Sequence, residues 1–267
     1  SVYLNPEEVR RSNEPLQGNF EGIGVQFQII RDTVNVVAVI AGGPSEQVGI
    51  LAGDKIVSIN DEEATGSKLN NAFVFERLRG VKGSKVKIGI VRHPSVTPVY
   101  FDIIRDKIPL HSVDASYMID NEIGYIKISR FSSTTVNEFE EAIKNFNSGK
   151  IEKLIIDLRG NSGGLLSTAI ELTDHFFERG KLIVYTEGVN SSRENSNSTS
   201  RGIYKNGQVV VLIDQGSASA SEIFAGAIQD WDRGVLIGRR TFGKGLVQRR
   251  FSMPDGSEIR LTTSRYH

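Results

Sequence analysis

The sequence contains no cysteine among its 267 residues. This absence excludes disulfide bonds, catalysis by a thiol and metal sites with cysteine ligands. An excess of one charge is also lacking, because 32 Lys and Arg residues balance 32 Asp and Glu residues. Such a balance produces no overall field that would attract nucleic acid or an anionic membrane. We therefore expect no nucleic-acid partner.

Long hydrophobic runs are missing as well. No apolar stretch approaches the roughly 20 residues that a membrane-spanning helix needs, and no charged and then apolar leader follows Ser1. The abrupt start and end lead us to expect a trimmed chain that has lost a targeting segment. With 39% hydrophobic and 24% charged residues, the composition is that of a globular protein long enough for two domains.

The first half of the chain has the pattern of a small, mainly β domain. Two alternating or apolar runs, 22–30 and 34–40, flank a polar break, which is typical of antiparallel strands. A short helix is expected at 43–49 and an amphipathic one at 69–78, and further strands at 51–60, 85–91 and 99–104. A polar segment before them, 1–16, carries a short helix that begins at Pro6.

Two segments of this half resemble PDZ domains, namely Gly22-Ile-Gly-Val25 and Leu51-Ala-Gly-Asp-Lys-Ile-Val-Ser-Ile-Asn60. The resemblance implies that the backbone around Gly22, Ile23, Gly24 and Val25 binds the terminal carboxylate of a peptide. Glycines allow the close backbone approach that this needs, and a free strand edge after them could accept an added peptide strand. The alternative is that Gly22 and Gly24 only form a tight turn.

The second half alternates strands with helices after a linker at 107–112, which predicts an α/β domain with much parallel pairing. Strands are expected at 122–128, 153–158, 181–186 and 209–213, helices at 134–147 and 165–177, and a closing pair of strands up to Tyr266. The intervening residues 188–202 are rich in Ser, Asn, Thr and Arg. We expect them to form a mobile loop.

Three serines, Ser217, Ser219 and Ser221, lie between the strand at 209–213 and an apolar-patterned run at 223–228. A hydroxyl at the N-terminus of a helix lies beside unpaired N–H groups and the positive end of the helix dipole, which favours developing negative charge. The pattern does not choose among the three. A run of Ser and Ala is also common small-residue packing, and Ser221 followed by Glu222 is a plausible helix cap.

A serine nucleophile needs a base, and the four histidines suggest none: His93 lies in a turn, His111 in the linker, His175 in a helix and His267 at the end. Lys244, between two glycines, is the remaining candidate. Burial among apolar groups would lower the pKa of its amine from the usual value of about 10.4. The working hypothesis is a serine–lysine peptidase with a buried amine, and the alternative is a surface lysine in a glycine turn.

A nucleotide site competes for the same lysine. Residues 238–245 nearly match the phosphate-binding pattern G-x-x-x-x-G-K-[ST], and Asp157 ends an apolar strand as a magnesium ligand would. However, Gly245 replaces the hydroxyl that should bind the metal, and a strand rather than a helix is expected after it. We therefore expect neither a nucleotide nor a metal or other cofactor.

Three separated motifs resemble the carboxyl-terminal processing peptidases, which are PDZ-containing serine proteases with a serine–lysine dyad. They are Asp157-Leu-Arg-Gly-Asn-Ser-Gly-Gly164, Ser217-Ala-Ser-Ala-Ser-Glu-Ile223 and Thr241-Phe-Gly-Lys-Gly-Leu-Val-Gln248. The resemblance implies an α/β protein with a trimmed N-terminal helical segment (1–19), a PDZ domain (20–107), which is a small β-barrel-like sandwich with two helices, and a protease core (108–267). The core would be of the ClpP/crotonase-like type and truncated at its C-terminal end.

The resemblance also implies the roles of the site residues. Ser219 would be the nucleophile, Lys244 the general base and Gln248 the residue that positions the lysine amine. The oxyanion would be bound by the N–H of Ala220 and a backbone N–H of the Gly163-Gly164 turn. One departure is Ser162, which stands where proline or glycine is common in the family, and a serine there leaves the backbone donors available.

The implied function is cleavage of proteins near their C-terminus, with the PDZ domain binding the free tail of the substrate and gating the site. The family further implies an exported, periplasmic or envelope location and allows a homodimer formed through segments outside this sequence. A second class stays open, a PDZ-type peptide-binding or scaffold protein whose protease core is catalytically incomplete.

Overall fold

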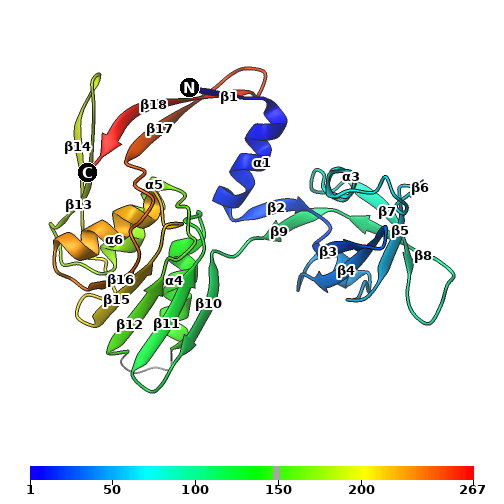
Figure 1. The fold of residues 1–267 in the computed structure, drawn as a ribbon, viewed down its shortest axis with the longest axis horizontal. Helices are drawn as coiled ribbons and strands as arrows, with labels where there is room; N and C mark the ends of the chain where they lie inside the picture. Colours follow the sequence, from blue (N-terminus) through cyan, green and yellow to red (C-terminus); the bar gives the residue numbers. More distant parts are fainter. Residues whose placement is uncertain (147–150) are drawn as a thin grey trace. The chain divides into compact units, whose positions relative to one another are not determined.

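The computed structural model describes residues 1–146 and 151–267, which form two compact units (Figure 1). One unit is Asn19–Leu110. The other joins Ser1–Gly18 to His111–His267, so the N-terminal residues belong with the C-terminal part of the chain. Each unit has its own hydrophobic core. No helix in the described part of the chain is long and apolar enough to span a membrane.

The Asn19–Leu110 unit is an antiparallel β-structure with two short helices. Its main sheet has the order β3 (Val25–Ile30), β4 (Thr33–Val39), β5 (Lys55–Ile59), β7 (Lys85–Val91) and β8 (Val99–Ile104), with β6 (Glu62–Glu63) on β5. A separate pair joins β2 (Asn19–Gly22) to β9 (Asp106–Pro109), and the helices are α2 (Pro44–Gln47) and α3 (Asn71–Leu78). These strands and helices confirm the expected PDZ-like architecture.

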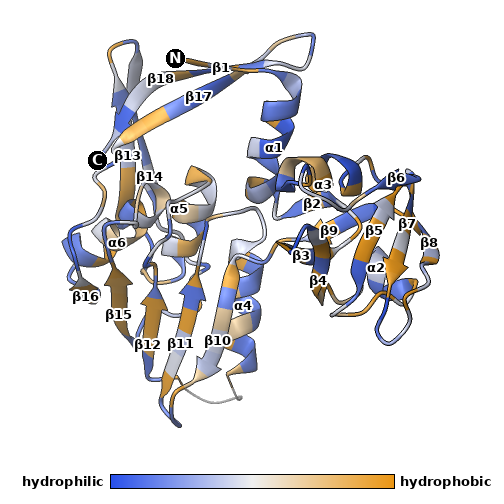
Figure 2. Ribbon diagram, turned by 45° about the vertical axis from the view of Figure 1, so that its right-hand side comes forward, coloured by the Kyte–Doolittle hydropathy of each residue, from blue (hydrophilic) through white to orange (hydrophobic). Residues whose placement is uncertain are grey.

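The larger unit is built on a central sheet in the order β10 (Val113–Met118), β11 (Ile123–Ile128), β12 (Lys153–Asp157), β15 (Gln208–Ile213) and β16 (Val235–Gly238). The four strands from β11 to β16 pair in parallel, and β10 is antiparallel. Figure 2 shows that β12 and β15, in the middle of this sheet, are mainly apolar. Because both faces of a parallel sheet are normally covered, such runs are expected, and the predicted α/β class is confirmed.

Three helices connect these strands: α4 (Thr135–Asn145), α5 (Leu166–Asp174) and α6 (Ala220–Asp230). Their apolar sides supply much of the core, for example Phe139, Leu172 and Phe224, which are fully buried. The helix expected over 134–147 is therefore present as α4, and residue 147 at its expected end lies outside the described residues.

A second sheet in the same unit joins the two ends of the chain. Its order is β1 (Val2–Leu4), β18 (Glu258–Tyr266), β13 (Leu182–Gly188) and β14 (Ser191–Asn197), with β17 (Leu246–Ser252) paired to β18. Helix α1 (Pro6–Gln17) follows β1 and is fixed at its start by a capping box between Asn5 and Glu8. The N-terminal residues thus contribute structure beside the closing hairpin.

The expectation of a mobile loop over residues 188–202 is wrong for most of that segment. Residues 191–197 form β14, which pairs antiparallel with β13. Most β14 side chains are exposed, so composition gave no sign of a strand. The pairing is made through backbone hydrogen bonds, which do not depend on apolar side chains, and Arg193 adds a cation–π contact 3.7 Å above the Tyr185 ring.

Candidate active site

The candidate site forms where two neighbouring parallel strands end. β12 and β15 pair in parallel, with Asp157 opposite Leu212, so the loops that follow them leave the sheet at the same edge, where α/β proteins commonly bind ligands. The two loops are bonded to each other: Asn161 accepts at its backbone oxygen from the Ala218 N–H (3.0 Å) and from the Ser221 hydroxyl (2.9 Å). The double-glycine turn is thereby held against the start of α6.

The three serines of this loop have different surroundings. Ser217 and Ser221 are fully buried, and their hydroxyls donate to the backbone carbonyls of Leu158 (2.8 Å) and Asn161. Ser219 instead lines a pocket of about 600 Å³. Two of the three hydroxyls therefore hold the loop in place, and Ser219 alone among them faces open space.

Ser219 has an unusual backbone. It precedes α6 with φ 57° and ψ −112°, a conformation that a non-glycine residue rarely adopts and that costs of the order of 1–3 kcal/mol. Glu222 accepts a 2.7 Å hydrogen bond from the Ser219 N–H, which helps to hold this geometry. Strain of this kind gathers at functional sites because the surrounding structure must enforce it.

Gly163 packs directly against Ser219. A Cβ added at Gly163 would lie 2.8 Å from the Ser219 Cβ and 3.0 Å from the Ala220 nitrogen, and one at Gly164 would lie 2.0 Å from the Phe131 carbonyl oxygen. Both glycines also have positive φ, 100° and 154°. Only glycine fits at these two positions, which is the physical reason for the double glycine in the motif.

Two backbone N–H groups remain free beside the Ser219 side chain. The N–H of Gly163 donates to the Asn161 side-chain oxygen at 2.9 Å. Within the described residues, no acceptor takes the N–H of Gly164 or that of Ala220 at the start of α6. Of the donors expected from the sequence, Gly164 and Ala220 are thus the two that can receive a developing negative charge.

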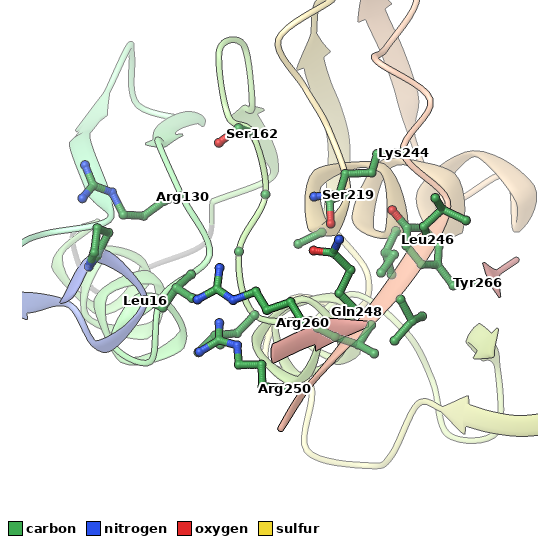
Figure 3. Close-up of a pocket in the computed structure, with 18 of the residues that line it drawn as sticks. Leu16, Arg130, Ser162, Ser219, Lys244, Leu246, Gln248, Arg250, Arg260 and Tyr266 are labelled. Carbon is green, nitrogen blue, oxygen red and sulfur yellow. The ribbon is translucent and has the colours of Figure 1, made fainter. Parts of the chain in front are cut away.

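Lys244 and Gln248 line the same pocket as Ser219. Figure 3 shows the three side chains gathered at one end of it. Lys244 is exposed, so the expectation of a buried amine is wrong for this structure. Most of its segment lies at the surface, where no other element of the described structure covers the lysine. No hydrogen bond between the described residues joins the Lys244 amine to the Ser219 hydroxyl. The strand β17 follows directly, as expected, where a phosphate loop would require a helix.

Glu222 connects the serine to the lysine segment, a role that the motif comparison did not reveal. Besides the Ser219 N–H, its carboxylate accepts from the N–H groups of Gly243 (2.6 Å) and Lys244 (2.8 Å). Burial would raise the pKa of Glu222, but these backbone hydrogen bonds keep it below its ordinary value. A usable signal existed, because Ser219 and Glu222 have the spacing of a capping box.

Tyr266 is a second residue that sequence reasoning missed. Its backbone N–H donates to the Gly245 carbonyl at 3.1 Å, and its side chain lines the pocket with Ser219 (Figure 3). The buried phenol oxygen has no hydrogen-bond partner that meets normal geometry in the described structure. The pKa of Tyr266 is raised to about 12, mainly by burial. The Glu222 charge also raises this pKa, whereas the nearby Ser219 hydroxyl lowers it. No local pattern around the last residues marks this position.

Asp157, considered above as a magnesium ligand, is instead the anchor of the turn that follows it. It is fully buried and accepts hydrogen bonds from the Arg159 guanidinium (2.6 Å) and the Tyr125 hydroxyl (2.7 Å). Burial alone would raise the pKa of Asp157, but these two partners lower it to about 2. The ion pair fixes the path of the chain into the double-glycine turn.

The histidines lie elsewhere. His175 is buried at the C-terminal end of α5 against the Phe139 ring, and burial lowers its pKa. None of the residues that line the pocket is a histidine. The position of His175 therefore gives no support to a histidine base for Ser219.

The candidate peptide-binding residues lie at a free strand edge in the other unit. Gly22 ends β2, Val25 begins β3, and β3 is the outermost strand of its sheet. The carbonyls of Ile23 and Gly24 accept from Ser45 and Ile40, whereas their N–H groups have no acceptor among the described residues. Helix α3 flanks the edge, with the Phe27 and Phe75 rings 5.2 Å apart. The unpaired edge of β3 can therefore pair with an added peptide strand.

A hydroxyl at a helix N-terminus, beside two unpaired N–H groups at the edge of a parallel sheet, is the arrangement of a serine hydrolase. The comparisons with known proteins agree. The chain belongs to peptidase family S41, which residues 122–267 match, and its residues 22–103 match the PDZ domain.

The proteins similar to this chain include two bacterial proteases and a protease named for photosystem II D1. The chain is 38% identical over 267 residues to the carboxy-terminal processing protease CtpA of Bacillus subtilis and 35% identical over 277 residues to the carboxy-terminal-processing protease of Bartonella bacilliformis. Both alignments cover 100% of this chain but 56% and 62% of the relatives, so the chain spans little more than half of their length. The solved photosystem II D1 C-terminal processing protease aligns with 99% of this chain and 72% of its own, at TM-score 0.57 and 27% identity.

Removal of the Asp157 charge is expected to destabilise the larger unit in a pH-dependent way. Because the folded pKa of about 2 lies below the ordinary 3.8, the charge stabilises the fold above pH 4, and this contribution is lost as the pH falls through 2. Asp157→Asn should lower the free energy of unfolding by about 2 kcal/mol at pH 7 and by about half as much near pH 3. Urea denaturation at both pH values measures this. The exposed Asp230→Asn serves as control, and a pH-independent difference would contradict the assignment.

Glu222→Gln is expected to reduce peptidase turnover by about ten- to a hundredfold, because three N–H groups that fix the serine and the lysine segment lose a charged acceptor. Steady-state kinetics of the purified protein, with the exposed Glu187→Gln as a matched control, provide the measurement. An unchanged kcat would show that the carboxylate is dispensable for the geometry.

Proposed function

We propose that this protein is a serine endopeptidase that cleaves proteins near their C-terminus, with Ser219 as nucleophile and Lys244 as general base. The observation that carries the proposal is the position of the Ser219 hydroxyl at the N-terminus of α6, beside the unpaired N–H groups of Ala220 and Gly164. The names of the similar proteins, which are carboxy-terminal processing proteases, support the same reaction.

The reaction is acyl transfer. The neutral Lys244 amine takes the proton of the Ser219 hydroxyl, and the resulting alkoxide attacks the carbonyl carbon of the scissile peptide bond. The oxyanion receives hydrogen bonds from Ala220 and Gly164, and each such donor is worth about 10²–10³ in rate. When the C–N bond breaks, the charged Lys244 protonates the leaving amine. A water molecule, deprotonated by Lys244, then hydrolyses the ester and restores Ser219.

Substrate binding completes this arrangement. Lys244 and Gln248 are exposed in the pocket, so a bound peptide would remove water from the amine and favour its neutral form. The side-chain oxygen of Gln248 is a suitable acceptor to orient the amine toward Ser219. Catalytic hydrogen bonds are often loose before the substrate arrives, and the lack of a hydrogen bond between the amine and the hydroxyl within the described residues fits such a resting state.

The PDZ domain would supply the selection of chain ends. A free C-terminal carboxylate would accept from the unpaired N–H groups at Ile23 and Gly24, between Gly22 and Val25, while the tail adds as a strand along β3. Release and capture of this tail would gate access to the peptidase. Such substrates lie in the cell envelope in the family that the sequence resembles, so we also propose an exported or periplasmic location and a homodimer formed through segments outside this sequence.

A second candidate is a PDZ-type binding protein with an inactive core. The observation in its favour is the exposed Lys244, which makes no hydrogen bond to Ser219 within the described structure. Binding without cleavage would separate it from the peptidase.

Ser219→Ala and Lys244→Met are each expected to lower kcat/KM for a peptide substrate by at least about a thousandfold, since either change removes the dyad. Peptide cleavage followed by mass spectrometry measures this, with the exposed Lys144→Met as control. If Lys244→Met cleaves as well as the parent, the base has been assigned wrongly. A fluorophosphonate probe should label Ser219, and labelling of Ser217 or Ser221 would move the nucleophile.

The Ser219→Ala protein should still bind substrate tails. Isothermal titration compares a peptide that ends in a free carboxylate with the same peptide ending in an amide. The Kd of the amide is expected to be at least about tenfold higher, because a charged acceptor is lost. Gly24→Ala, whose new Cβ would lie 3.1 Å from the Ile108 side chain, should weaken the carboxylate peptide. Gly42→Ala has a similar positive φ but open space around it and is the matched control. Equal affinity for both peptides would refute capture of the carboxylate.

A further inference from the structure

The part of the pocket away from Ser219 is strongly basic. Arg130, Arg250 and Arg260 line it together with Lys244, and no acidic side chain is among the lining residues that the structure describes. Figure 3 shows the three arginine side chains on the same side of the pocket, away from Lys244. Four cationic groups around one cavity produce a positive potential. This potential lowers the energy of a peptide carboxylate that is bound there.

The position of Arg250 on β17 relates this field to the reaction centre. Gln248 and Arg250 are two residues apart on one strand, so their side chains point to the same face, about 7 Å apart at a rise of 3.4 Å per residue. An extended peptide advances by the same distance in two residues. A substrate bound along β17 with its scissile bond near Ser219 would therefore present its second or third residue from that bond to Arg250.

The arginines are also placed against the usual rules for a hairpin. Arg250 and Arg260 lie directly opposite each other in the β17–β18 pair, and like charges in opposed positions destabilise a sheet. Glu258 compensates one of them, because its buried carboxylate accepts from Arg260 at 2.7 Å. Arg250 finds only a neutral partner, the Asn13 side-chain oxygen.

Arg130 strengthens this contrast. No hydrogen bond or ion pair holds its guanidinium within the described part of the chain, although it lines the pocket. A purely structural role accounts for Arg260, which also donates to the Ser12 hydroxyl at 2.6 Å. It does not account for the uncompensated Arg250 and Arg130. A local rule broken beside a candidate site without internal compensation points to a ligand.

We propose that Arg130 and Arg250 form a subsite that binds a carboxylate of the substrate two to three residues from the scissile bond. The proposal rests on the peptidase function given above and adds the substrate class, peptides with an acidic group close to the cleavage point. The carboxylate has two possible sources, an Asp or Glu side chain or the free terminus of the substrate.

The test compares matched fluorogenic peptides cleaved by the full chain. One set carries Glu or Gln at each of the three positions on either side of a common scissile bond, and a second set ends two or three residues after that bond in a free carboxylate or an amide. We expect one Glu position or the free carboxylate to raise kcat/KM about tenfold over its neutral match. The set that responds identifies the source of the carboxylate.

Variants assign the effect to the subsite. Arg250→Gln and Arg130→Gln should each reduce the preference for the charged peptide to about threefold or less, and high salt should reduce it in the parent. Arg249→Gln is the matched control, because the neighbouring Arg249 does not line the pocket and should keep the full preference. Melting temperatures check the fold, and Arg130→Gln remains informative if Arg250→Gln unfolds, since Arg130 has no bonded partner to lose.

The outcomes separate this inference from the proposed function. Cleavage of all peptides with equal kcat/KM, or a preference that survives both arginine substitutions, would overturn the subsite and leave the peptidase standing. Failure to cleave any peptide, together with no labelling of Ser219, would overturn the peptidase and the subsite with it.

Discussion

The carboxylate of Glu222 is the interaction on which the candidate site depends. It joins three backbone N–H groups, one from the strained Ser219 and two from the segment that carries Lys244. These residues are more than twenty positions apart and belong to different elements, a helix start and the approach to β17. This single half-buried acceptor therefore sets the separation of the Ser219 and Lys244 backbones and offsets part of the strain at Ser219. A charged acceptor suits this task, since it makes stronger hydrogen bonds than a neutral one.

The second constraint is the edge of the parallel sheet. Because β12 and β15 are neighbours, the turn at Gly163-Gly164 and the start of α6 lie next to each other at one edge of the sheet. Asn161 secures their contact through its backbone oxygen, and the absence of side chains on the glycines brings the donors close to Ser219. The ion pair between the buried Asp157 and the exposed Arg159 fixes the chain at the start of this turn. The order of the strands thus brings Ser219 and the backbone donors together, and the side chains around them fix their exact positions.

Much of this could be predicted from the sequence. Strand and helix periodicity predicted the α/β class, and the glycine pattern around residues 163–164 has a direct steric cause. Other features depend on contacts that no local pattern records. The burial of Lys244 was predicted wrongly because exposure is decided by what packs over a loop, and β14 was missed because backbone pairing needs no apolar residues. Tyr266 reaches the site only through the register of β18, which a sequence alone does not specify.

The pairing of β1 with β18 has a consequence for biosynthesis. One wall of the pocket comes from the hairpin of β17 and β18, in which Arg260 lies opposite Val2 of β1 and donates to the Ser12 hydroxyl of α1. A growing chain on the ribosome contains Ser219 and Lys244 before it contains this wall. The pocket therefore stays incomplete until β18 has emerged and paired with β1. The candidate serine and lysine are therefore present in the nascent chain before the strand that completes their pocket.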